Sequence, residues 1–205
     1  MIIDPTSEIA SSIYKLLTGA VVPRPIAFVS TVNVEGQPNL SAFSFFTVVS
    51  ANPPVVCFSP MVRGSDGKRK DTLNNIEQTR EFVVNIVSED FAAQMNKTAP
   101  EFPPEVNEFE VSGLTPVASD LVKPPRVKES RIQMECRLLQ VVHVSDKPLG
   151  GSLVMGEVVR FHFAEELEME NLRIDPARLK AIGRMGGPTY VRTTDLFELQ
   201  RPTKS

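Results

Sequence analysis

Small hydroxyl and amide side chains gather in a segment of the chain that is otherwise apolar. Between residues 27 and 49, Phe, Val and Ala alternate with Ser30, Thr31, Asn39, Ser41, Ser44 and Thr47. On a pair of neighbouring strands, such donors and acceptors can bond the N and O atoms along the rim of a planar heteroaromatic ring. Composition alone favours a plainer interpretation, in which the Ser and Thr side chains occupy solvated strand faces.

A basic, glycine-containing stretch follows at residues 63–72, with the sequence RGSDGKRKDT. It carries four cations, among them Arg63 and Lys70, and it leads into a predicted helix that Thr72 can cap. Helix-end N–H groups and Arg or Lys donors both favour a dianion, so the stretch predicts a monophosphate site. The glycine spacing is not that of a Walker loop, and a basic surface loop without a ligand would look similar.

Two further features carry donors that a planar ligand could use. In the segment GRMGGPTY, Arg184 and Tyr190 could lie over the exposed face of such a ligand, although a plain turn between helix and strand explains the glycines equally. Asn85 is a lone amide in the apolar segment EFVVNIV and must bond something. A ligand and a neighbouring strand are comparable partners for it.

Acid-base and metal chemistry find little support in the sequence. The chain has two histidines, His143 and His162, which we interpret as packed or surface side chains on strands. Its two cysteines, Cys57 and Cys136, lie in apolar strand-like segments and are predicted to be buried free thiols. No Ser-His-Asp or paired-carboxylate pattern is present, so we name no catalytic residue and predict no metal site.

Bulk properties exclude several classes of partner. A net charge of −3 and a pI near 5.5 offer no broad positive field for nucleic acid. The first residues lack a basic region followed by an apolar stretch, and no segment approaches the length of a membrane span. We therefore expect a cytoplasmic protein that acts without nucleic acid or membrane, with residues 1–205 forming one domain.

The apolar pattern predicts a mainly β fold with short helices. Residues 20–49 look like two strands joined by a turn at Glu35-Gly36, and residues 130–145 and 151–166 look like a long antiparallel hairpin. A proline-rich excursion at about 99–125 is expected to be ordered but neither helix nor strand. The other expected elements are helices at 7–17, 71–80, 88–98 and 175–182, and strands at 55–60, 80–88 and 194–202.

Taken in order, these segments resemble a known family. PRPIAFVSTVNVEGQPNLSAFSFFTVVSANPPVVCFS, then KDTLNNIEQTREFVVNIV, and finally GRMGGPTYVRTTDLFEL are similar to the flavin reductase-like, FMN-binding split-barrel family. Within it, the similarity is to the branch of flavoredoxin and of the reductase components of nitrilotriacetate-type monooxygenases. The resemblance implies a split β-barrel of Greek-key type, and an FMN held between the two subunits of a homodimer.

The resemblance also assigns roles to the residues named above. Ser30, Thr31, Asn39, Ser41, Ser44 and Thr47 fall on the strand pair that holds the flavin. Arg63, Lys70 and Thr72 fall where the family binds the phosphate, while Asn85, Arg184 and Tyr190 correspond to the ring environment.

The implied chemistry is hydride transfer from NADH or NADPH to the flavin, which passes electrons to free flavin, oxygen or a partner such as a monooxygenase. A non-enzymatic, flavoredoxin-like carrier with tightly bound FMN is the alternative. A third possibility is a binding barrel without flavin, against which the basic stretch and the hydroxyl-rich strands argue. No G-x-G-x-x-G fingerprint is present to decide between the first two.

Overall fold

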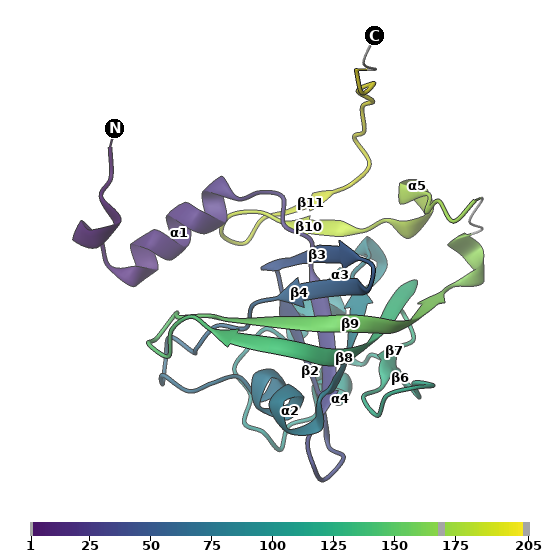
Figure 1. The fold of residues 1–205 in the computed structure, drawn as a ribbon, viewed down its shortest axis with the longest axis horizontal. Coiled ribbons are helices and arrows are strands. Elements are labelled where there is room, and N and C mark those ends of the chain that lie inside the picture. The colour runs from purple at the N-terminus through teal and green to yellow at the C-terminus, as the bar shows by residue number, and fades with distance from the viewer. Residues whose placement is uncertain (1, 168–170, 203–205) are drawn as a thin grey trace.

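A computed structural model describes residues 2–167 and 171–202, and its central element is one seven-stranded antiparallel sheet (Figure 1). From edge to edge the strands are β2 (Pro38–Phe43), β1 (Ala27–Val32), β5 (Glu81–Ile86), β8 (Ile132–His143), β9 (Ser152–Phe163), β4 (Pro54–Phe58) and β3 (Phe46–Ala51). Strands β2 and β3 stand at opposite edges, yet only Ser44 and Phe45 separate them along the chain. The sheet must therefore curl until its edges approach one another, as in a split barrel.

Apolar side chains fill both faces of this curled sheet. One cluster contains Val29, Phe58 and Phe82 and lies inside the curl. A second cluster contains Phe28, Phe91 and Phe109 and lies between the sheet and the segments that cover it. Because β1 contributes alternate residues to both clusters, all six of its residues are buried. This strand is thus a fixed frame for the polar side chains nearby.

Short helices and hairpins surround the sheet (Figure 1). They are α1 (Ala10–Ala20), α2 (Asp71–Thr79), α3 (Ala92–Lys97), α4 (Glu108–Ser112), α5 (Pro176–Leu179), the pair β6 (Pro116–Val117) and β7 (Arg126–Val127), and the hairpin of β10 (Ile182–Arg184) and β11 (Tyr190–Arg192). Single 3-10 turns occur at Pro5–Ser7, Glu89–Phe91 and Glu165–Leu167. Figure 1 shows α1 and the β10–β11 hairpin at the same end of the molecule. Within the described residues no helix combines the length and the apolar character that crossing a membrane requires.

The predicted mainly β fold, the turn at Glu35-Gly36 and the long β8–β9 hairpin are confirmed. Residues 20–49, however, contain most of three strands and not two, because the chain turns at Ser44-Phe45 and places β3 beside β4. Thr72 is not the cap of α2. Lys70 occupies the N-cap position without a side-chain bond, and the Thr72 hydroxyl donates instead to Asn39 Oδ1.

Two further predictions about elements are wrong. The excursion at 99–125 contains α4 and β6, since Asn107 caps α4 by accepting a bond from Phe109 N and Gly113 ends it at a φ of 74°. Residues 194–202 form no strand. Their apolar side chains are exposed, Phe197 by 84%, and among the described residues no strand pairs with them.

Candidate functional site

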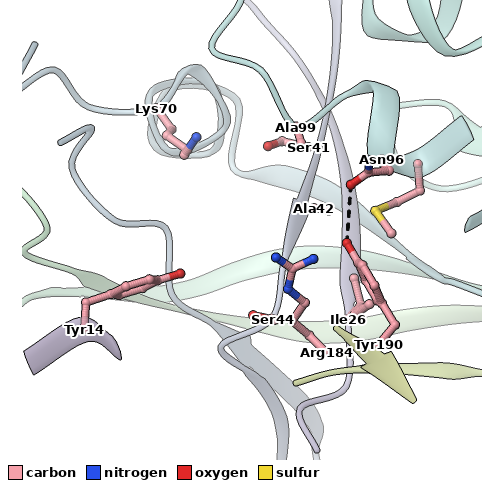
Figure 2. A pocket seen from close by; sticks show the side chains of 11 residues that line it. Tyr14, Ile26, Ser41, Ala42, Ser44, Lys70, Asn96, Ala99, Arg184 and Tyr190 are labelled. Carbon is pink, nitrogen blue, oxygen red and sulfur yellow. Dashed lines mark hydrogen bonds between the residues drawn. The ribbon is translucent and has the colours of Figure 1, made fainter. Parts of the chain in front are cut away.

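Two adjoining cavities lie against β2, and Figure 2 shows the one that extends to α1 and the β10–β11 hairpin. The larger has a volume of about 220 Å³ and the smaller of about 20 Å³. Ser41 and Lys70 line both, so the two cavities form one elongated site. One end of this site is charged and the other is aromatic.

The charged end is built by the basic loop and the start of α2. The Arg63 guanidinium bonds Asp71 at 3.0 Å, and its buried Nε has no partner. Among the described residues nothing bonds the Lys70 ammonium or accepts from the first two backbone N–H groups of α2, at Asp71 and Thr72. The residues that carry these unfilled donors all line the smaller cavity, which is the arrangement expected of an anion site.

Carboxylates also line the charged end and oppose an anion. Asp71, Glu101 and Glu108 outnumber the two cations there. Burial raises the pKa of Glu108, whose residue is 7% exposed, and nearby Asp71 adds to the rise, so its negative charge is easier to remove than that of an exposed glutamate. Binding of a phosphate must therefore depend mainly on Lys70, which has no carboxylate partner among the described residues.

Three of the predicted flavin ligands are bonded to one another beneath the cavities. The Thr72 hydroxyl donates to Asn39 Oδ1 at 2.7 Å, and Asn39 Nδ2 donates to Glu108 Oε1 at 2.9 Å. Thr31 Oγ1 accepts from Asn75 Nδ2 at 3.1 Å and donates to Asn39 Oδ1 at 3.4 Å. This network fixes the orientation of the Asn39 amide, while Thr31 itself is buried and does not line either cavity.

The aromatic end lies between α1 and the β10–β11 hairpin (Figure 2). Tyr14 comes from α1 and Tyr190 from β11, and the Tyr190 hydroxyl lies 3.5 Å from Asn96 Oδ1. The Arg184 guanidinium points into the cavity, 4.5 Å from the centroid of the Tyr190 ring, and donates to Gly187 O. This end therefore offers two ring faces and a cation to a planar ligand.

Besides Thr31, three residues predicted as ligands lie outside these cavities. Ser30 is fully buried and donates to Pro125 O, and the Asn85 amide donates to Phe28 O and accepts from Val127 N. Their polar groups hold the excursion and β7 against the sheet, because buried polar groups must find partners. Thr47 faces a third, mainly apolar cavity of about 540 Å³, which also contains Phe45 and Phe46. The structure thus brings together Asn39, Ser41, Ser44, Arg63, Lys70, Thr72, Arg184 and Tyr190.

Several residues of the site were not predicted from the sequence. Tyr14, Met95, Asn96 and Glu108 line it, and nothing in their sequence neighbourhood sets them apart from ordinary helix residues. Arg24 is different, because a cation between Pro23 and Pro25 in an apolar segment is a visible signal. Its buried guanidinium bonds Ser44, at the border of the larger cavity.

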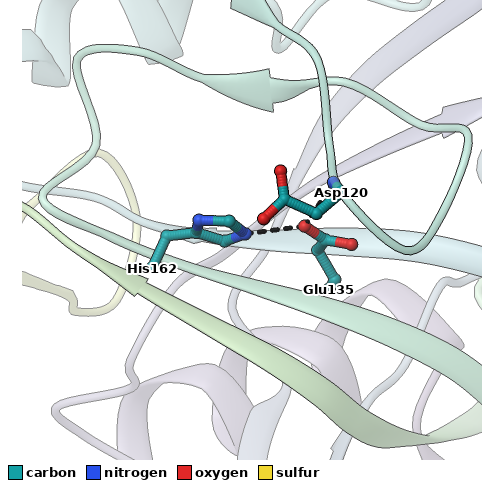
Figure 3. A group of neighbouring side chains, drawn as sticks. All are labelled: Asp120, Glu135 and His162. Atoms are coloured by element: carbon teal, nitrogen blue, oxygen red, sulfur yellow. Dashed lines mark hydrogen bonds and ion pairs between the residues drawn. The ribbon is translucent and has the colours of Figure 1, made fainter.

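One cluster of potential metal ligands exists among the described residues, formed by Asp120, Glu135 and His162 (Figure 3). Glu135 Oε1 accepts from His162 Nε2 at 2.6 Å and from Asp120 N at 2.8 Å. Its Oε2 accepts from Leu121 N and Val122 N, and Asp120 pairs with Arg160 at 2.6 Å. Because these oxygens already have partners, the cluster holds a loop to β8 and β9 and is poorly suited to a cation.

Comparison with known proteins decides the family. Residues 19–181 match the flavin reductase like domain. The chain belongs to the flavin reductase-like family. Among solved structures, component B of nitrilotriacetate monooxygenase from Bacillus cereus is 41% identical with a TM-score of 0.91, covering 97% of this chain and 98% of that one.

Two further structures agree with this assignment. The 2-nitrobenzoate 2-nitroreductase of Pseudomonas fluorescens is 35% identical with a TM-score of 0.86, covering 99% of this chain and 97% of that one. A Shewanella frigidimarina protein with a split barrel domain is 23% identical, with a TM-score of 0.84 and coverage of 98% and 100%. At that identity the last match concerns the fold alone, which is a split barrel as the resemblance implied.

Proposed function

We propose that this flavin reductase-like protein binds FMN and acts as an NAD(P)H-dependent flavin oxidoreductase that passes electrons to free flavin or to a partner monooxygenase. The observation that carries the proposal is the elongated site with unfilled donors at one end and two tyrosines at the other. The similarity to a monooxygenase component over nearly the whole chain supports it.

The residues of the site fit FMN group by group. The orphaned Nε of Arg63, the Lys70 ammonium and the N–H groups at the start of α2 would hold the phosphate. Ser41 and Ser44 would bond the polar rim of the ring, with Asn39 held in place by Glu108. When bound, the cofactor supplies a ring that accepts hydride from a nicotinamide and passes electrons on.

The protein's part in this chemistry is to bind, orient and exclude water, without an obligatory acid or base. Tyr14 and Tyr190 would flank the ring, and Arg184 would meet the phosphate of a nicotinamide dinucleotide from the side of the β10–β11 hairpin. Glycines at 186 and 187 free the hairpin turn, and Gly187 has a φ of 60°. We therefore assign Arg184 to the nicotinamide and Lys70 to FMN.

We also propose that the working form is a two-fold symmetric homodimer whose second subunit completes the flavin site. Support comes from α1, where Leu17 and Val21 are more than half exposed and line the third, apolar cavity together with Phe45 and Phe46. Light scattering of the purified protein is expected to give the mass of two chains. A monomer that still holds FMN tightly would contradict this.

Steady-state oxidation of NADH and NADPH, with and without FMN, FAD or riboflavin, tests the function. We expect turnover that needs FMN and releases reduced flavin to an acceptor. A yellow protein that oxidises neither nucleotide would instead indicate the flavoredoxin-like carrier. The relative from Pseudomonas fluorescens makes 2-nitrobenzoate a useful additional acceptor in the same assay.

A further inference from the structure

Arg24 connects three parts of the molecule that surround the larger cavity. Its residue is 5% exposed, and its Nη1 donates to Thr18 O and Val21 O at 2.6 Å each, at the carboxyl end of α1. Its Nη2 donates to Met185 O at 2.9 Å, in the turn of the β10–β11 hairpin, and its Nε donates to Ser44 Oγ at 3.3 Å. One side chain thus bonds α1, the hairpin and the corner between β2 and β3.

The backbone at Arg24 strengthens the same connection. Arg24 N donates to Arg184 O at 3.0 Å, and Arg184 N donates to Arg24 O at 2.8 Å. The turn of the hairpin also packs directly on α1, because a Cβ placed on Gly186 would lie 3.6 Å from the Cα of Gly19. The turn end of the hairpin is therefore attached to the rest of the protein through the segment that contains Arg24, whereas its base is attached through Ile182 N, which donates to Val87 O, and through the Arg192–Glu89 ion pair.

The chemistry of the partners indicates what this arginine does. All four acceptors are neutral, and no carboxylate within the described ranges forms an ion pair with Arg24. Two of them are carbonyls at the carboxyl end of α1, where the partial negative charge of a helix favours a cation. Burying a charge without a counter-ion raises the free energy of the folded state. What Arg24 contributes in return is a set of hydrogen bonds in several fixed directions.

We propose that Arg24 is a positioning residue that holds α1 and the β10–β11 hairpin at a fixed separation across the cavity, and so sets the spacing between Tyr14 and Tyr190. The expected effect on flavin and nicotinamide binding rests on the proposed function. The expected effect on how firmly α1 and the hairpin, the two walls of the cavity, are held does not. Lysine cannot replace the arginine fully, since one ammonium cannot reach acceptors that three separate nitrogens now bond.

The amino-acid composition supplies a local reporter for this proposal. Tyr14 and Tyr190 are the two tyrosines of the chain, and the chain has no tryptophan. Intrinsic emission therefore comes from the two walls of the cavity, and its quenching by acrylamide measures their accessibility. Amide hydrogen exchange of residues 10–21 and 183–190 measures how firmly each wall is held.

The experiment compares Arg24→Met, Arg24→Lys and a control, Arg126→Met. Arg126 also bonds neutral acceptors, Ala118 O and Gln133 Oε1, but it lines neither part of the proposed site. We expect Arg24→Met to speed exchange in residues 183–190 about tenfold or more, the change for losing a charge-assisted hydrogen bond, and to increase quenching. Arg24→Lys should be intermediate, and the control should match the wild type in both measurements.

Wild-type exchange and quenching in both Arg24 variants would overturn the proposal. If Arg24→Met does not fold, as judged by circular dichroism, Arg24→Lys decides alone, and wild-type behaviour of that variant overturns the proposal. In the kinetic assay, a positioning role predicts that Arg24→Lys raises the KM for the nicotinamide more than it lowers kcat. A wild-type protein that oxidises no nicotinamide would refute the proposed function and leave the exchange result standing.

Discussion

Two polar clusters on this sheet, the cavity around Lys70 and the group around Glu135, differ in how completely their atoms are bonded. At Glu135 both carboxylate oxygens accept two hydrogen bonds each. Around Lys70 the ammonium, the Arg63 Nε and the first N–H groups of α2 have no partner among the described residues. A fully bonded cluster contributes to folding, whereas buried donors left open beside a cavity indicate a ligand.

The pKa shifts of one glutamate in each cluster, Glu135 and Glu108, show the same difference. Burial alone would raise the pKa of Glu135, but the Asp120 N–H, His162 and the Leu121 N–H outweigh it and hold that pKa below its ordinary value. At Glu108, beside the cavity, burial prevails and the pKa is raised. The hydrogen bonds to the Glu135 carboxylate outweigh the effect of its burial, and those to the Glu108 carboxylate do not.

The largest expected effect is on stability at the bonded cluster. Glu135→Ala removes the acceptor of three backbone N–H groups and of His162, and we expect a loss of about 3–5 kcal/mol in the free energy of unfolding. Urea denaturation measures this, with Asp120→Ala as the control, since a solvent-exposed ion pair contributes little to stability. A Glu135→Ala protein as stable as the control would mean that the cluster does not hold the loop.

A smaller effect, on ligand binding, is expected at the open cluster. Lys70→Ala should weaken FMN by about 1.5–3 kcal/mol, the range for losing a hydrogen bond to a charged group, and leave unfolding unchanged. Equilibrium titration with FMN measures the first and urea denaturation the second. Unchanged FMN affinity would remove Lys70 from the phosphate site.

A substitution at the aromatic end should change the kinetics of nicotinamide oxidation. Arg184→Ala is expected to raise the KM for the nicotinamide about fivefold, equivalent to about 1 kcal/mol, with little change in FMN affinity. Steady-state kinetics at saturating FMN measures it. Loss of FMN with normal nicotinamide kinetics would make Arg184 a flavin ligand and reverse the division of roles with Lys70.

The smallest effect is a change in the pH dependence of stability. Because the pKa of Glu135 is depressed in the folded state, its contribution is present above the ordinary value of 4.5 and is lost as the pH falls through the folded value. Stability measured against pH should therefore decline more steeply on the acid side for the wild type than for Glu135→Gln. Parallel curves would show that Glu135 is not stabilised as an anion.

Sequence patterns predicted the β8–β9 hairpin and most of the other elements because these depend on local alternation and turn chemistry. They could not place β3 at the sheet edge opposite β2, because the turn at Ser44-Phe45 depends on how the whole sheet closes and not on the local sequence. They also failed at residues 194–202, where apolar alternation resembles a strand but no described strand pairs with it.

The same distinction applies to the site. Lys70, Arg63 and Arg184 could be found from charge and glycine spacing, because a binding loop concentrates those residues locally. Asn85 and Ser30 were predicted as ligands but bond backbone groups in the structure, since a buried polar residue on a strand has the same sequence signature whether its partner is a ligand or a backbone carbonyl. Tyr14 and Asn96 reach the cavity only through tertiary packing, which leaves no local pattern.

Comparing the affinities of FMN and riboflavin for the wild-type protein tests the central claim most directly. Both tyrosines line the larger cavity, so quenching of their emission reports binding at this place for either ligand. The two ligands differ by the phosphate that the Lys70 end would hold. The account predicts that FMN binds at least about tenfold more tightly than riboflavin. Equal affinities would contradict it.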